Sequence, residues 1–249
     1  MSTLISIEGL GKLYPKAGEP SLKEVSFNIH QGERFGIFGP NGAGKTTLIS
    51  ILCQIIPATE GQVRYFIKDR EVSFSDIKQH IGFVPQDLAL YEGLTAFQNV
   101  EYFGALFNMS AFQVRERAAH LFGLLGLSQV ANKPVKTFSG GMKRRLNLIV
   151  GVMHEPGILF LDEPTVGVDI QSRTAILEFL NTLNESGTSI VYTSHHLDEA
   201  ERFCDRIAVI DRGRVIALDE IGPLLREHAA ADLTHLLIKL TGKEFRDHV

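Results

Sequence analysis

The chain is poor in the features that define several classes of protein. Its 249 residues include no tryptophan and only two cysteines, Cys53 and Cys204. Because these cysteines lie far apart and in no metal-like spacing, we predict inert thiols rather than a disulfide framework or a zinc site. No apolar run reaches the ~18 residues typical of a membrane-spanning helix, and the first residues lack the pattern of a secretory signal. We therefore expect any work at a membrane to require a partner.

The chain also lacks an excess of positive charge. It carries 25 Lys and Arg residues against 29 Asp and Glu residues, for a formal net charge of −4. This balance provides no broad basic surface for a phosphate backbone, so nucleic acid is not an expected partner. A hydrophobic share of 44% and a charged share of 22% are typical of folded globular proteins rather than disordered ones.

Strand patterns alternating with helix patterns dominate what is present. Candidate strands lie at 4–10, 25–29, 34–38, 158–161 and 189–193. Candidate helices at 46–55 and 171–185 each lie between two of these strands. Strands separated by helices favour a mostly parallel sheet, so we predict an α/β fold.

The middle of the chain and its end depart from this alternation. Residues 88–153 have a largely helical pattern and predict a helical insert within the α/β domain. Two short runs that flank Arg212-Gly213 predict a hairpin. We expect one main domain over 1–220 and a short, mainly helical tail over 221–249.

A glycine-rich loop follows the strand at 34–38 and opens the next helix. It matches the pattern G-x-x-x-x-G-K-[ST] in the run Gly39-Pro40-Asn41-Gly42-Ala43-Gly44-Lys45-Thr46-Thr47. In such a loop the glycines let backbone N–H groups surround phosphates, the lysine reaches the β- and γ-phosphates, and the first hydroxyl ligates Mg²⁺. The loop therefore predicts a P-loop NTPase that binds a nucleotide and Mg²⁺, with Lys45 at the phosphates and Thr46 at the metal.

Two adjacent carboxylates end the apolar strand at 158–161. Asp162 and Glu163 would lie at the carboxyl end of a strand, where α/β sheets place their ligands. We assign Asp162 to the hydration shell of Mg²⁺ and Glu163 to the attacking water, as general base. Taken alone, an Asp-Glu pair is more often an acidic turn, so this assignment depends on the phosphate loop.

A second candidate anion site opens a helix at Ser139-Gly140-Gly141. Ser139 is a suitable N-cap, and the two glycines leave the first backbone N–H groups unobstructed. Ser-Gly-Gly at a helix start shortly before the Asp-Glu strand resembles the signature motif of the ABC ATPases. The resemblance covers about residues 2–220 and implies an N-terminal antiparallel β region, a P-loop core and a helical subdomain. It also implies a dimer in which this motif contacts the ATP held by the opposite subunit.

The resemblance assigns four further positions. Tyr14 is placed where the family stacks an aromatic ring on adenine, and Gln86 resembles the glutamine that meets Mg²⁺ and water. Asp169 resembles the loop aspartate that couples the two sites of the dimer. His195 resembles the histidine that contacts the γ-phosphate, with His196 as its rival; the register of Leu197-Asp198-Glu199-Ala200-Glu201 favours His195.

Ser-Gly-Gly is followed here by Met142-Lys143-Arg144-Arg145, where the family most often has glutamine first. This continuation is similar to the type-two exporters of drugs, polysaccharides, antibiotics or lipids, and it favours export over import. The resemblance then implies a separate transmembrane permease, a position on the cytoplasmic face of the membrane, and a homodimer or a heterodimer with a related ATPase. A soluble ABC ATPase acting on ribosomes or chromosomes, and a subunit without catalytic activity, are the alternatives; the cargo is not encoded in this chain.

Overall fold

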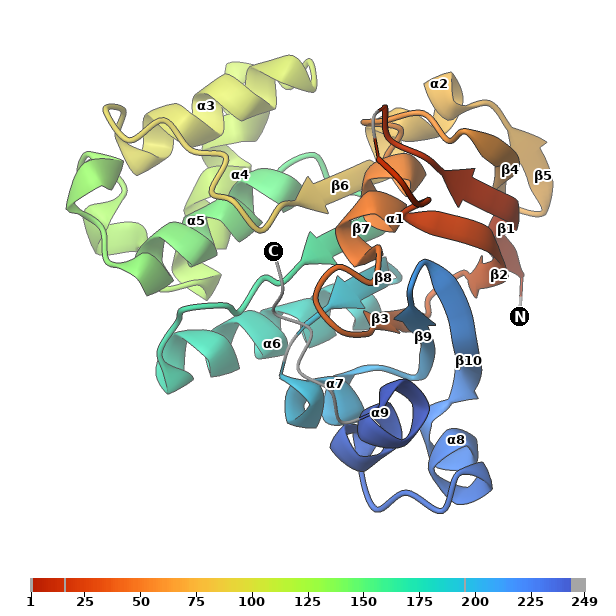
Figure 1. The fold of residues 1–249 in the computed structure, drawn as a ribbon. Coiled ribbons are helices and arrows are strands. Elements are labelled where there is room, and N and C mark those ends of the chain that lie inside the picture. Colours follow the sequence, from red (N-terminus) through yellow and green to blue (C-terminus); the bar gives the residue numbers. More distant parts are fainter. Residues whose placement is uncertain (1, 16, 195, 243–249) are drawn as a thin grey trace. The chain divides into compact units, whose positions relative to one another are not determined.

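The computed structural model describes residues 2–15, 17–194 and 196–242. The chain forms two compact units, one from residues 1–78 with 189–249 and the other from 79–188. The first unit contains an antiparallel sheet of four strands in the order β2-β1-β4-β5 (Figure 1). These strands are β1 (Thr3–Lys12), β2 (Leu22–His30), β4 (Glu60–Ile67) and β5 (Arg70–Val72). This sheet confirms the antiparallel N-terminal region.

Three parallel strands and one antiparallel strand form the rest of the first unit's sheet structure. The parallel strands are β3 (Arg34–Phe38), β8 (Ser189–Thr193) and β9 (Arg206–Asp211), and β3 pairs in parallel with both of the others. β10 (Arg214–Glu220) runs antiparallel to β9 and closes the predicted hairpin, with Arg214 opposite Asp211. The helices of this unit's α/β part are α1 (Lys45–Leu52), α2 (Phe74–Ile77) and α7 (Leu197–Phe203). β3 and β8 are almost wholly buried, as expected for strands of a parallel sheet.

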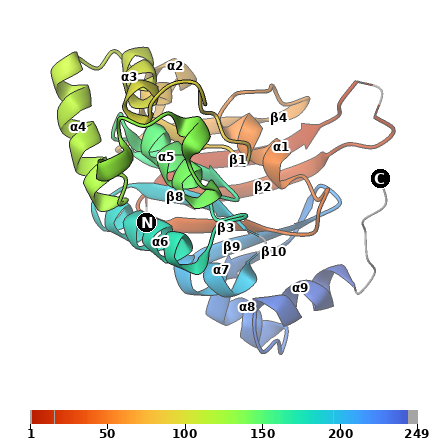
Figure 2. The ribbon, with the colours of Figure 1, turned by 90° about the vertical axis from the view of Figure 1, so that its left-hand side faces the viewer.

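The second unit combines two parallel strands with four α-helices (Figures 1 and 2). The strands are β6 (Ile81–Val84) and β7 (Ile158–Asp162). The helices are α3 (Ala96–Leu106), α4 (Ala111–Leu124), α5 (Gly140–Val152) and α6 (Ile170–Glu185). Short 3₁₀ turns lie at Lys78–His80, Ser128–Val130 and Val135–Thr137. Three of the four helices lie within the stretch 88–153, which had a helical pattern in the sequence.

Local sequence explains where these helices begin. Thr95 caps α3 and Ser110 caps α4, and in both cases the glutamine three residues later completes a capping box. α1 ends three residues earlier than the predicted 46–55 because Gln54 has a φ of +50°. A left-handed residue cannot continue a right-handed helix, so the chain turns away there.

The described part of the tail forms two helices, α8 (Ile221–Glu227) and α9 (Leu233–Thr241), and α9 lies against α7 (Figure 1). The Asp232 side chain caps α9 by accepting from His235 N at 2.7 Å, and Leu233 N donates to the Glu201 carboxylate at 3.0 Å. Leu233 and Leu236 are buried beside strand residues of the first unit and leave a space of only about 10 Å³. Within the described residues, no helix is both long and apolar enough to cross a membrane.

Leu236→Ala tests the packing of the tail, because Leu236 is fully buried whereas Ile238 on the same helix is 39% exposed. We expect Leu236→Ala to lower the free energy of unfolding by about 2–5 kcal/mol, or to release α9 to proteolysis at unchanged global stability. Ile238→Ala is the matched control and should change stability by about 0.5 kcal/mol or less. Urea unfolding with limited proteolysis measures both, and equal behaviour of the two variants would contradict the docked position of α9.

Candidate functional site

The predicted phosphate loop joins β3 to α1 in the first unit (Figure 1). Gly39 and Gly44 have φ values of +154° and +107°. A Cβ atom on Gly39 would lie 2.0 Å from Ile210 O, and one on Gly44 would lie 2.6 Å from Ser21 O. The loop is therefore so close to its neighbours that glycine is required at both positions.

Lys45 is the first residue of α1 and is only 7% exposed. Its ammonium group donates to Gly39 O at 2.9 Å and to Pro40 O at 3.1 Å, so the side chain folds back over the loop. Among the described residues, no side chain forms a capping hydrogen bond at the start of α1. The first N–H groups of a helix lack partners within the helix and carry partial positive charge, so this loop can bind an anion such as a phosphate.

Tyr14 lies near the end of the same loop. Its hydroxyl is 3.3 Å from Thr47 Oγ1, and the Lys12 ammonium lies 5.2 Å from the centre of its ring. The ring is 37% exposed, which leaves a face that a planar ligand could contact. The structure thus brings Tyr14 to the phosphate loop, although their positions in the sequence are about 30 residues apart.

In the second unit, Asp162 ends the buried strand β7 and Glu163 follows it. The two residues are 1% and 5% exposed. Glu163 has a φ of +52°, which is unfavourable for any residue with a side chain and costs on the order of 1–2 kcal/mol. Such outliers persist where the surrounding structure requires them, and they occur often at functional sites. The residue types around Glu163 did not predict this left-handed backbone conformation.

The Ser-Gly-Gly motif opens α5 as predicted. Ser139 is the N-cap, and its hydroxyl accepts from Met142 N at 3.3 Å. A Cβ atom on Gly141 would lie 2.5 Å from Ser172 Oγ, whereas one on Gly140 would find its nearest neighbour 3.7 Å away. Gly141 therefore allows α5 to approach the start of α6, whereas a Cβ atom on Gly140 would make only an ordinary contact with Gly167 O.

Asp169 is the N-cap of α6, a role that the sequence analysis did not assign. Its carboxylate accepts from Ser172 N and from Ser172 Oγ, both at 2.9 Å. These two hydrogen bonds hold the pKa of Asp169 below its usual value. The carboxylate lies close to Gly141, so the structure places two residues assigned to the dimer contact side by side.

Gln86 lies in the loop after β6. Three residues on helices hold this loop in place by hydrogen bonds. Asn147 donates to Pro85 O at 3.3 Å and accepts from Ala89 N at 3.2 Å. Asn99 accepts from Tyr91 N at 2.8 Å, and Arg144 donates to Gln86 O. The sequence analysis missed all three, although polar Asn147 within the apolar run of α5 was a visible signal.

The assignment of His195 concerns a residue outside those that the structure describes. Its rival His196 is the N-cap of α7, and its backbone N–H donates to Ser194 Oγ at 2.9 Å. The choice between the two histidines therefore remains the prediction made from the sequence.

The parallel strands, the antiparallel N-terminal sheet and the phosphate loop define a P-loop NTPase. Comparison with known proteins narrows this class, because the profile of the ABC transporter family matches residues 22–166. The linearmycin resistance ATP-binding protein LnrL of Bacillus subtilis is 42% identical over 86% of this chain and 68% of that protein. The daunorubicin/doxorubicin resistance ATP-binding protein DrrA of Streptomyces peucetius is 39% identical over 88% of this chain and 66% of that protein.

A solved structure is similar over most of its length. It is a dimeric ATP-binding cassette in a post-hydrolysis state with ADP and Pi bound, and it is 30% identical with a TM-score of 0.77, covering 87% of this chain and 98% of that one. The chain belongs to the ABC transporter family. It is an ATP-binding and ATP-hydrolysing subunit of that family.

Lys45→Ala tests the phosphate loop. Because the ammonium group would be lost where phosphate charge must be stabilised, we expect the ATPase rate to fall by about 100-fold or more. Lys23→Ala, which removes an equal charge from the surface of the same unit, should leave the rate within about twofold. Steady-state ATPase assays and nucleotide-binding measurements on both variants provide the comparison, and normal binding and turnover by Lys45→Ala would contradict the assignment.

Alanine substitutions at Gly140 and Gly141 form a matched pair that tests the start of α5. Gly141→Ala should lower the free energy of unfolding by about 1–3 kcal/mol because its methyl group meets Ser172. Gly140→Ala should leave stability equal or higher, because alanine favours a helix and its Cβ atom would lie 3.7 Å from Gly167 O, an ordinary contact distance. Both should lower ATPase activity. Thermal unfolding and ATPase assays test this, and full activity of Gly140→Ala would remove the proposed anion contact.

Proposed function

We propose that the chain energises an exporter, together with a separate permease that crosses the membrane. The observation that carries this proposal is the similarity, over most of the chain, to ATP-binding proteins named for resistance to antibiotics. The Met142-Lys143-Arg144-Arg145 continuation of the signature motif supports the same class. The cargo would be bound by the permease, and the chain would work from the cytoplasmic face of the membrane.

Each step of ATP hydrolysis would be carried out by a residue assigned above. Lys45 and backbone N–H groups of the loop 39–47, other than that of Pro40, which has none, would bind the phosphates, and Tyr14 would stack on adenine. Glu163 would orient the attacking water and accept its proton, as the water oxygen bonds to the γ-phosphorus and the bond to ADP breaks. Its burial supports this role, because a nearly water-free environment strengthens electrostatic interactions. His195 would contact the γ-phosphate.

The residues assigned to Mg²⁺ fit that ion. Thr46, Asp162 and Gln86 offer a hydroxyl, a carboxylate and a carboxamide oxygen, which are ligand types that Mg²⁺ prefers. Among the described residues, no group of three or more His, Cys, Asp or Glu side chains could hold a metal ion. Mg²⁺ commonly retains waters and binds phosphate oxygens, and it would neutralise phosphate charge when bound.

Two ATPase chains would act together. The helix start at Ser139-Gly140-Gly141 of one chain would bind the γ-phosphate of the ATP held by the other, and Asp169 beside it would link the two sites. The two glycines support this arrangement, because they place no side chain over the backbone donors at the start of the helix. The partner would be a second copy or a related ATPase. Closure would pull on the permease, and hydrolysis would reopen the dimer.

The permease would contact the segment from Asp87 to Met109 in the second unit. Tyr91, Tyr102 and Leu106 are 48%, 44% and 62% exposed, and the two tyrosine rings pack edge to face at 4.8 Å. Contiguous exposed apolar side chains of this kind are typical of sites that bind another protein. The coupling between transport and hydrolysis would run through this segment to Gln86.

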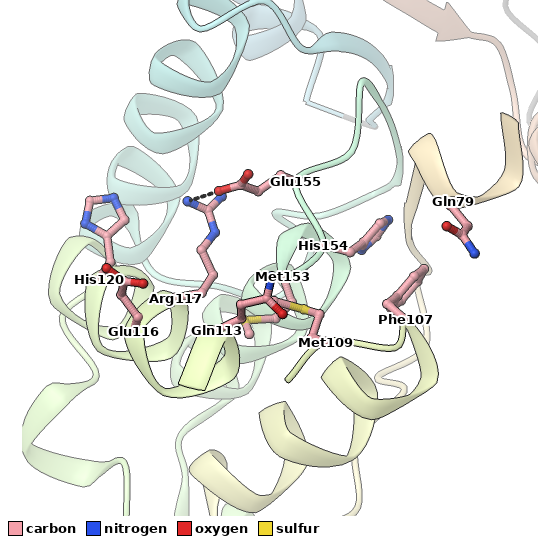
Figure 3. A pocket seen from close by; sticks show the side chains of 10 residues that line it. All are labelled: Gln79, Phe107, Met109, Gln113, Glu116, Arg117, His120, Met153, His154 and Glu155. Carbon is pink, nitrogen blue, oxygen red and sulfur yellow. Dashed lines mark ion pairs between the residues drawn. The ribbon is translucent and has the colours of Figure 1, made fainter. Parts of the chain in front are cut away.

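A pocket of about 680 Å³ lies at the C-terminal end of this segment (Figure 3). Phe107 stacks on His154 with the ring centres 3.6 Å apart, and Arg117 forms an ion pair with Glu155 at 3.1 Å. The pocket is lined by Gln79, Phe107, Met109, Gln113, Glu116, Arg117, His120, Met153, His154 and Glu155. Its mixture of apolar, cationic and anionic side chains is suited to a short amphipathic segment of the permease.

Tagged chain carrying Glu163→Gln, purified from membranes with ATP present, tests the proposal. We expect ATP binding to remain, turnover to fall by about 100-fold or more, and a polytopic membrane protein to co-purify. Glu185→Gln is the control, because it replaces an exposed carboxylate at the end of α6 with a carboxamide. This variant should hydrolyse ATP normally. Recovery of ribosomes or chromosomal proteins without a membrane subunit would overturn the transport proposal. Turnover by Glu163→Gln at the normal rate would overturn the assignment of the base.

A further inference from the structure

The basic triplet Lys143-Arg144-Arg145 has no step of the proposed hydrolysis assigned to it. Its three side chains leave α5 toward different segments of the second unit. Lys143 forms an ion pair with Glu92. Arg145 donates to Leu125 O at 2.7 Å, at the end of α4. Arg144 alone bonds to two segments that carry residues assigned to catalysis.

The guanidinium group of Arg144 joins two loops that are far apart in the sequence. Nη1 donates to Gln86 O, in the loop after β6. Nε donates to Val166 O at 3.4 Å, in the turn after β7. One side chain of the signature helix therefore holds both the loop assigned to the permease contact and the turn that follows the catalytic strand.

The turn at Val166 is connected to Glu163 by a hydrogen bond. Val166 N donates to Glu163 O at 3.3 Å, and Glu163 itself has the left-handed φ of +52°. A change in the position of Val166 O would therefore alter the backbone that orients the Glu163 carboxylate. Arg144 thus contacts the turn three residues after the proposed base, and it bonds to Gln86 directly.

Burial and neighbouring charges act on the pKa of Arg144 in opposite directions, and burial has the larger effect. Burial lowers the pKa of its guanidinium group, and the carboxylates of Asp87 and Glu163 raise it. Each of these carboxylates belongs to one of the two segments that Arg144 joins. An arginine suits this position because its planar fork presents donors in several fixed directions, whereas lysine presents one compact charge.

We propose that Arg144 is a positioning residue that fixes the Gln86 loop relative to Glu163, so that movement of this loop changes the rate of hydrolysis. The inference rests on the roles proposed above for Gln86 and Glu163. Arg144 would act on the chemical step rather than on ATP binding, because its bonds reach the two loops and not the phosphate loop.

The test compares Arg144→Gln and Arg144→Lys with Lys143→Gln in steady-state ATPase assays of the purified full chain. Lys143→Gln is matched to Arg144→Gln because each removes one positive charge from the same helix, and it should keep kcat within about twofold. We expect Arg144→Gln to lower kcat by about 10- to 100-fold, with KM for ATP changed less than about threefold. Arg144→Lys should lie between Arg144→Gln and the wild type.

A double-mutant cycle separates positioning from a general structural role. If Arg144 acts through Gln86, Arg144→Gln should cost clearly less kcat in a Gln86→Ala background than in the wild type. Additive losses, an unchanged kcat, or equal losses in Lys143→Gln would overturn the inference. If thermal unfolding shows that Arg144→Gln does not fold, Arg144→Lys takes its place in the cycle. A wild-type chain without ATPase activity would instead overturn the proposed function.

Discussion

The close approach between the phosphate loop and its neighbours is the constraint on which the rest of the structure depends. Ile210 O and Ser21 O lie where any side chain on Gly39 or Gly44 would have to be. The parallel pairing of β3 with β9 brings Ile210 to the loop, so this contact exists only when the sheet has formed. Backbone N–H groups of such a loop can bind an anion, and Lys45 adds a buried positive charge beside them. A chain of net negative charge can bind a polyphosphate because these donors are local and fixed.

In the second unit, the start of α5 likewise presents backbone N–H groups that can bind an anion. There the donors come from a helix that Ser139 caps, and the close contact between Gly141 and Ser172 holds this helix against α6. The N–H groups at a helix start lack partners within the helix, and a phosphate group can supply those partners. In the proposed dimer this phosphate would belong to the ATP held by the other chain, so ATP would link the two chains.

The sequence predicted the features that depend on short segments. The phosphate loop, the strand that ends at Asp162 and the N-cap at Ser139 each follow from a few adjacent residues. The sequence did not predict the left-handed backbone of Glu163, the capping role of Asp169 or the bonds of Arg144 and Asn147. Each of these depends on a turn without a compositional signal or on segments that only the folded chain brings together: Arg144 and Gln86 are separated by 58 positions. The early end of α1 at Leu52 likewise depends on the backbone of Gln54.

The central claim is that ATP joins two ATPase chains, and the mass of the Glu163→Gln chain in solution tests it most directly. Sedimentation velocity would be measured with ATP, with ADP and without nucleotide. The account predicts that the sedimenting mass doubles with ATP only, and that adding Gly140→Ala to the same chain reduces the dimer. A monomer under all three conditions in the presence of bound ATP, or a dimer that forms regardless of nucleotide, would contradict it.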